Sequence, residues 1–229
     1  SSLIATTVLT HTDTAQIRVH VTRKVNVGTV IAKPKAYDQD RKKRWPLLVF
    51  LHGSGERGTD LAKVRIHGPL HHYDEGTDYP FIIAAPQCPD NTWWDWNVLS
   101  GWLDQVLKKL RVNPDQIYLT GLSMGGYGTW EWGAREASRF AALIPICGGG
   151  SRIGALPLSG MPIWCVHGTD DPVVPISESL IMVERAQRAG AIVKMSSVPG
   201  EGHGVWINFY KNEDWVNWLL QHKLSDRKR

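Results

Sequence analysis

The stretch IYLTGLSMGG, residues 117–126, decides how the rest of the chain is interpreted. Its first four residues form a short apolar run that is typical of a buried β-strand. The pattern G-x-S-x-G follows at 121–125, and a helical segment comes next. In this strand–turn–helix arrangement a tight turn holds the serine hydroxyl above the sheet, and glycines avoid collisions with neighbouring backbone. Ser123 is therefore a candidate nucleophile, although the pentapeptide alone also fits an ordinary glycine-rich turn.

Further apolar runs and helical patterns alternate on both sides of this stretch. Strand-like runs lie at 46–51, 81–85, 141–146, 163–166 and, more weakly, 192–198. Helical patterns cover 124–135, 177–189, 213–221 and a stripe from Trp102 to Leu110 that ends before Asn113-Pro114. Such alternation predicts an α/β fold with a mostly parallel central sheet and helices on both faces. An opening region with strand-like alternation at Ile17, Val19 and Val21 precedes the series.

The organisation predicted from the sequence is a single domain over residues 1–229, because no linker or internal repeat interrupts the series. Residues 1–45 form N-terminal strands and a loop, 46–222 the catalytic core, and 223–229 a basic tail. Between Cys147 and Ile163 lie only about fifteen residues. That is too short for a helical lid, so no large lid domain is expected.

A serine hydroxyl is a poor nucleophile unless a base and an orienting acid assist it. His203 is the base candidate, because it lies in the glycine-rich loop 199–204 after the last predicted strand. The acid candidates, Asp170 and Asp171, compete just after the strand predicted at 163–166. The chain order Ser, Asp, His is the one that this architecture imposes. His52 and His167 also sit at strand ends and are interpreted as structural.

An oxyanion site requires a second N–H donor from the loop after an earlier strand. That loop is LHGSGERG at 51–58, and we assign the donors as the backbone N–H groups of Ser54 and Met124. Glu56 and Arg57 either pair and fix the loop or form an ordinary surface ion pair.

Aromatic residues near the predicted site are candidates for substrate contact. Trp93 and Trp94 follow a central strand, and Gln87 precedes them. Packing is the competing interpretation for the tryptophans. Helical patterns contain five further tryptophans that are expected in the core: Trp102, Trp130, Trp132, Trp215 and Trp218.

Composition excludes several classes of protein. The hydrophobic share of 42% and the charged share of 21% are ordinary for a soluble globular chain. The net charge of +4 is concentrated at 33–44 and 227–229, which we interpret as solvated loops, so no nucleic-acid partner is expected. Three cysteines without ligand spacing predict no metal site. No apolar run is long enough to span a membrane, and the sequence is compatible with a cytoplasmic protein or with export after removal of a signal peptide.

At this point the chain resembles the single-domain carboxylesterases of the α/β-hydrolase superfamily. It is most similar to the bacterial "predicted peptidase" or phospholipase/carboxylesterase-like group, which is related to feruloyl esterases and polyhydroxybutyrate depolymerases. The matching stretches are LLVFLHGSGERG at 47–58, APQC at 85–88, WWDW at 93–96, GLSMGG at 121–126, HGTDDPVVP at 167–175 and GEGHGVW at 200–206. The resemblance places the acid on Asp171 and implies ester hydrolysis through an acyl-enzyme, without cofactor or metal.

The expected substrates are short-chain or aryl carboxylic esters, as small molecules or linked to a polysaccharide. Two other functions stay open: a serine peptidase that uses the same groups, and a non-catalytic binding protein on a hydrolase scaffold. The sequence leaves the oligomeric state open.

Overall fold

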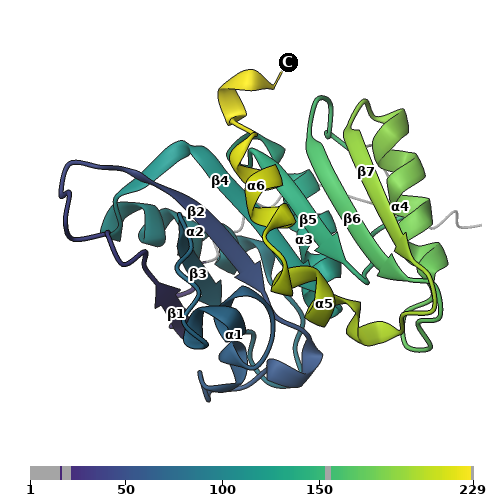
Figure 1. Cartoon of the computed structure of the whole chain (residues 1–229), viewed down its shortest axis with the longest axis horizontal. Helices are drawn as coiled ribbons and strands as arrows, with labels where there is room; N and C mark the ends of the chain where they lie inside the picture. The colour runs from purple at the N-terminus through teal and green to yellow at the C-terminus, as the bar shows by residue number, and fades with distance from the viewer. Residues whose placement is uncertain (1–15, 17–21, 153–155, 228–229) are drawn as a thin grey trace, which may run out of the picture.

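The structure is a computed structural model that describes residues 16, 22–152 and 156–227 (Figure 1). Within this part of the chain, seven strands form one sheet in the order β1-β3-β2-β4-β5-β6-β7. The strand β1 pairs antiparallel with β3, and every other neighbouring pair is parallel. The strands are β1 (Thr29–Ala32), β2 (Trp45–Leu51), β3 (Ile82–Pro86), β4 (Val112–Leu122), β5 (Ala142–Ile146), β6 (Pro162–Gly168) and β7 (Ile192–Val198).

Helices cover both faces of the sheet (Figure 1). One face carries α2 (Trp96–Lys109), α3 (Met124–Arg135) and α4 (Ile176–Arg188). The other carries α1 (Gly68–Asp74), α5 (Trp206–Lys211) and α6 (Asp214–Leu220). Short 3-10 turns join them at η1 (Ser54–Glu56), η2 (Lys63–Arg65), η3 (Ala137–Arg139), η4 (His203–Val205) and η5 (Leu224–Asp226). No helix in the described ranges is both long enough and apolar enough to cross a bilayer.

The strand β2 shows why the sheet is buried on both sides. Successive side chains of a strand point to opposite faces. Leu47 and Val49 therefore join the core under α2 and α3, whereas Leu48 and Phe50 join the core under α1 and α5. All four side chains are fully buried. The continuous apolar run in the sequence follows from this two-sided packing.

The predicted α/β architecture is confirmed, and the helix predicted at 124–135 coincides with α3. The strand β4 is longer than predicted, since it begins at Val112, which pairs with Trp45 before the register shifts. The sequence interpretation misses β1, α1 and α5, which are four to seven residues long and carry little periodicity. The strand expected around 17–21 lies outside the described residues. The described residues between β5 and β6 contain no helix.

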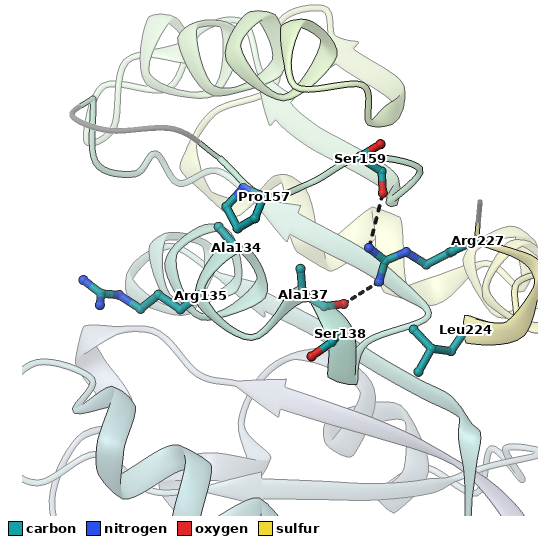
Figure 2. A pocket seen from close by; sticks show the side chains of 8 residues that line it. All are labelled: Ala134, Arg135, Ala137, Ser138, Pro157, Ser159, Leu224 and Arg227. Carbon is teal, nitrogen blue, oxygen red and sulfur yellow. Dashed lines mark hydrogen bonds between the residues drawn. The ribbon is translucent and has the colours of Figure 1, made fainter. Parts of the chain in front are cut away.

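The C-terminal segment departs from the expected solvated tail. The Arg227 guanidinium donates to the carbonyls of Ala137, Phe140 and Ser159, with Nη1 2.8 Å from the Phe140 oxygen and Nη2 3.4 Å from the Ser159 oxygen. Figure 2 shows this side chain reaching over the end of α3. The residue therefore ties the C-terminal segment to the core, because three main-chain acceptors converge on one cation.

The turn at Ser123 requires glycine on both sides. Ser123 adopts φ 53°, which is the left-handed region that L-residues seldom occupy. A Cβ atom on Gly125 would lie 1.9 Å from the Leu51 carbonyl oxygen, and one on Gly121 would lie 2.3 Å from the Gly125 carbonyl oxygen. Both clashing atoms belong to the backbone, so rotation of a side chain cannot relieve either clash.

We expect Gly125→Ala to reduce the free energy of unfolding by at least about 3 kcal/mol, because the added methyl group overlaps backbone of β2. The matched control is Gly101→Ala in α2, where a Cβ atom meets nothing within 4 Å. That variant should gain about 1 kcal/mol from the higher helix propensity of alanine. Urea denaturation of both proteins measures the contrast, and equal stability of the two would contradict this account of the turn.

Candidate active site

Ser123 lies between the end of β4 and the start of α3. Its N–H donates to the Ile146 carbonyl at 3.0 Å, and its carbonyl accepts from the Tyr127 N–H at 3.0 Å. These bonds fix the turn to β5 and to the first turn of the helix. The Ser123 hydroxyl oxygen then lies 2.8 Å from Nε2 of His203.

His203 lies in the loop after β7 and begins η4. Its Nδ1 is 2.7 Å from Oδ2 of Asp171. Because an ionised carboxylate only accepts hydrogen bonds, we assign the ring proton to Nδ1. Nε2 is then free to accept the hydrogen of the Ser123 hydroxyl. The side chain of His203 is 19% exposed, so the end of this hydrogen-bonded chain reaches the surface.

Asp171 follows β6 and is held on both carboxylate oxygens. Oδ1 accepts the N–H groups of Val173 and Val174, each at 2.9 Å, while Oδ2 faces His203. Burial raises the pKa of this carboxyl, but the hydrogen bonds from His203, Val174 and Val173 outweigh burial and hold the pKa below its usual value. Asp170, the competing candidate, is exposed and accepts from the Thr169 hydroxyl instead.

A second imidazole contacts the same carboxylate. His167 is fully buried, and its Nε2 lies 3.2 Å from Oδ2 of Asp171 and 2.8 Å from the Val174 carbonyl oxygen. Both neighbours are acceptors, so Nε2 carries a hydrogen. Nδ1 lies 2.7 Å from the Ser179 hydroxyl of α4, which donates to the Gly148 carbonyl. The structural role expected for His167 thus includes fixing the acid, which the sequence interpretation did not foresee.

The loop after β2 presents the proposed Ser54 donor. The Gly53 N–H is taken by the Glu56 carboxylate at 2.7 Å. In the part of the chain that the structure describes, neither the Ser54 N–H nor the Met124 N–H donates a hydrogen bond. Arg57 forms no ion pair with Glu56 there. Its guanidinium instead donates to the carbonyls of Ser54 and Thr92. Both predicted forms of a Glu56–Arg57 ion pair are therefore wrong, and Arg57 links two stretches of backbone.

The buried ring of His52 contacts this loop. Its Nδ1 lies 2.6 Å from the Gly53 carbonyl oxygen, and its Nε2 lies 3.0 Å from the Cys88 nitrogen. Burial lowers the pKa of His52 to about 4. The ring is therefore neutral near pH 7, donating from Nδ1 and accepting at Nε2. A neutral ring links the loop after β2 to the loop after β3.

The three candidates for substrate contact lie in different environments. Gln87 is buried, and its amide donates to the carbonyls of Glu56 and Asp60 at 2.9 and 2.8 Å. Trp94 is buried against the His52 ring. Burial leaves these two little surface for a substrate, and we reassign both to supporting the loops. Trp93 is 51% exposed, and its ring packs edge-on to Tyr127, one helical turn after the serine.

Three residues beside the site escaped sequence interpretation. Tyr127 lies one helical turn after Ser123, and Trp206 ends the GEGHGVW stretch three residues after His203, with its ring 5.2 Å from the His203 ring. Cys147 follows β5, and its sulfur lies within 4.8 Å of ligand atoms of Asp171 and His203. Burial raises the pKa of the Cys147 thiol, which keeps it protonated and a poor metal ligand. The other two groups are already bonded to each other.

A pocket of about 410 Å³ lies away from these residues (Figure 2). It opens at the C-terminal end of α3, beside Ala134, Ala137 and Arg227. Eleven residues of helix separate Ala134 from Ser123, which is about 16 Å. The pocket therefore belongs to another part of the surface.

Comparison with known proteins shows which proteins the chain is similar to. A model of the prolyl oligopeptidase family matches residues 157–224, the segment that carries Asp171 and His203. The chain is 31% identical over 137 residues to a bifunctional acetylxylan esterase/xylanase of Neocallimastix patriciarum, covering 56% of this chain and 20% of that protein. It is 25% identical over 180 residues to a probable feruloyl esterase C of Aspergillus terreus, covering 75% of this chain and 65% of that protein.

Among solved structures, the chain is similar to a thermostable esterase, with 32% identity and a TM-score of 0.74. The match covers 87% of this chain and 60% of that one. The chain thus spans less than two thirds of the length of each of these three proteins. The chain has the α/β-hydrolase fold, and its predicted resemblance to esterases, feruloyl esterases included, is confirmed.

Proposed function

We propose that the chain is a serine carboxylesterase that hydrolyses carboxylic esters through an acyl-enzyme. The observation that carries the proposal is the unbroken chain of contacts from Ser123 to His203 to Asp171, at 2.8 and 2.7 Å. This is the arrangement that converts a serine hydroxyl into a nucleophile, and a binding protein has no physical need to retain it.

In the proposed reaction His203 takes the Ser123 proton as the serine oxygen attacks the ester carbonyl. Asp171 holds the ring in the required tautomer and stabilises the imidazolium that forms. The N–H groups of Ser54 and Met124 receive the negative charge on the carbonyl oxygen. His203 then protonates the departing alcohol, and the same ring activates the water that hydrolyses the acyl-enzyme.

The substrates we propose are short-chain or aryl esters, free or attached to a polysaccharide. The exposed Trp93 and the adjoining Tyr127 offer an aromatic edge one helical turn from the nucleophile. Exposed aromatic side chains suit an aryl group or a sugar ring, because both can stack on an aromatic face. The names of the relatives, an acetylxylan esterase and a feruloyl esterase, support the same class of substrate.

A serine peptidase is the second candidate, favoured by the prolyl oligopeptidase model that matches 157–224. Ester and amide cleavage use the same groups, but an amide requires protonation of a poorer leaving group. Turnover of an aminoacyl ester and of its matching anilide separates the two candidates. A higher kcat/KM on the anilide would favour the peptidase.

We expect Ser123→Ala to lower kcat on p-nitrophenyl acetate by about 10⁴-fold or more, because the remaining groups cannot form an acyl-enzyme. The measurement is hydrolysis of p-nitrophenyl esters from acetate to long-chain acyl, with methyl ferulate and acetylated xylan. Activity confined to short-chain and aryl esters is expected. Activity that persists in Ser123→Ala would rule out the proposed nucleophile.

Ser54→Pro should lower kcat by about 10²- to 10³-fold, because it removes the proposed oxyanion N–H. Proline suits the first position of a helical turn, and the extended Gly53 before it tolerates proline. The matched control, Ser54→Ala, keeps the N–H and should keep kcat within about threefold of the original. Equal loss in both variants would show that the hydroxyl matters instead.

Trp93→Ala should lower kcat/KM for methyl ferulate by about two- to twelvefold. This factor corresponds to the loss of one aromatic contact, which contributes about 0.5–1.5 kcal/mol. Its kcat/KM for p-nitrophenyl acetate serves as the internal reference for any general loss of activity. We expect the ratio of the two constants to fall. An unchanged ratio would remove Trp93 from the substrate site.

A further inference from the structure

A second pocket, of about 380 Å³, lies between α1 and α5. Its inner wall is Trp206, whose ring lies 5.2 Å from the His203 ring and 5.7 Å from the His67 ring. The pocket is also lined by three side chains of types that can serve as metal ligands: His71, His72 and Glu75. This cluster, residues 71, 72 and 75, takes no part in the proposed reaction and is unassigned.

The last turn of α1 brings the three side chains together. Residues three and four apart in a helix share a face, so Glu75 is a neighbour of both histidines. Nε2 of His71 lies 3.4 Å from Oε1 of Glu75, and Nδ1 of His72 lies 3.1 Å from Oε2. The ring centroids of the histidines are 5.2 Å apart. The donor atoms of all three residues lie within 4.8 Å of one another.

We propose that this cluster binds one divalent transition metal, with Zn²⁺ the best match. Two imidazole nitrogens and a carboxylate oxygen are a zinc ligand set, whereas Mg²⁺ and Ca²⁺ prefer oxygen ligands alone. Zinc bonds of about 2.0–2.2 Å in a tetrahedron place ligand atoms about 3.3–3.6 Å apart. The observed separations need only small side-chain rotations to reach that spacing. Water fills the remaining position.

The charges around the cluster suit a cation at this place. The cluster occupies the C-terminal end of α1, where the backbone carbonyls carry partial negative charge. Arg65, on the preceding turn, is paired with Asp74, with Nε 2.8 Å from Oδ2. Lys211 lines the same pocket, and its positive charge opposes the binding of a cation.

Access to the cluster is open on one side. The side chain of Glu75 is 59% exposed and that of His71 is 47% exposed, whereas His72 is 15% exposed. An ion can therefore reach the cluster from solvent, where it meets one largely buried and two exposed ligands. The site needs no rearrangement of α1, and it does not depend on the proposed ester hydrolysis.

The test is calorimetric titration of the metal-free full chain with zinc chloride. We expect one Zn²⁺ per chain, bound at this cluster, and weaker binding of Mg²⁺ by at least about a hundredfold. His72→Ala and Glu75→Gln should each weaken Zn²⁺ binding by at least about tenfold. Thermal denaturation adds a second readout, since Zn²⁺ should raise the Tm of the original chain and not of the Glu75→Gln variant.

Two controls keep the result specific. His203→Ala removes the other described cluster of ligand atoms, formed by Cys147, Asp171 and His203, and should leave Zn²⁺ affinity unchanged. Far-ultraviolet circular dichroism checks that the variants fold, which is expected because Glu75 is at the surface. Absence of Zn²⁺ binding, or binding that survives both His72→Ala and Glu75→Gln, would overturn the proposal.

Discussion

The close approach of two backbone segments is the constraint on which the site depends. The turn after β4 packs directly on the carbonyl end of β2, at a distance that leaves no room for a side chain on Gly125. In this turn Ser123 adopts a left-handed φ of 53°, and its hydroxyl oxygen lies 2.8 Å from Nε2 of His203. The loop after β2 also lies beside this turn, because a Cβ atom on Gly53 would be 3.6 Å from Cβ of Ser123.

Buried polar groups hold the loops and the carboxylate around Ser123 in place. His52 and His167 both lie at strand ends and both bond to neighbouring loops. Asp171 accepts hydrogen bonds on both oxygens, and its pKa lies below its usual value despite burial. A carboxylate constrained in this way cannot rotate away from His203. The orientation of the base therefore originates in main-chain and buried contacts that no substrate has to supply.

The sequence was sufficient to predict the sheet and the turn that carries Ser123. Runs such as 47–51 are apolar at every position because both faces of the sheet are covered, and G-x-S-x-G has a steric cause that is visible in the pattern itself. It was not sufficient for Gln87, Trp94 and Arg227, whose partners lie between 27 and 90 residues away. Tyr127 and Trp206 were missed for a different reason. They lie within four residues of Ser123 and His203, but the local pattern does not show that their rings face the site.

The two flanks of the site differ in chemistry, and this bears on what determines selectivity. On one flank Trp93 and Tyr127 present aromatic surface, and on the other Trp206 separates His203 from a pocket rich in imidazoles. Ser123 and Asp171 are held by backbone and buried contacts, which tolerate little change. The flanking side chains are partly exposed and are supported by fewer contacts. Under the proposed function, substitution at these flanks should alter which ester fits without disturbing Ser123, so differences in substrate between chains of this fold should concentrate there.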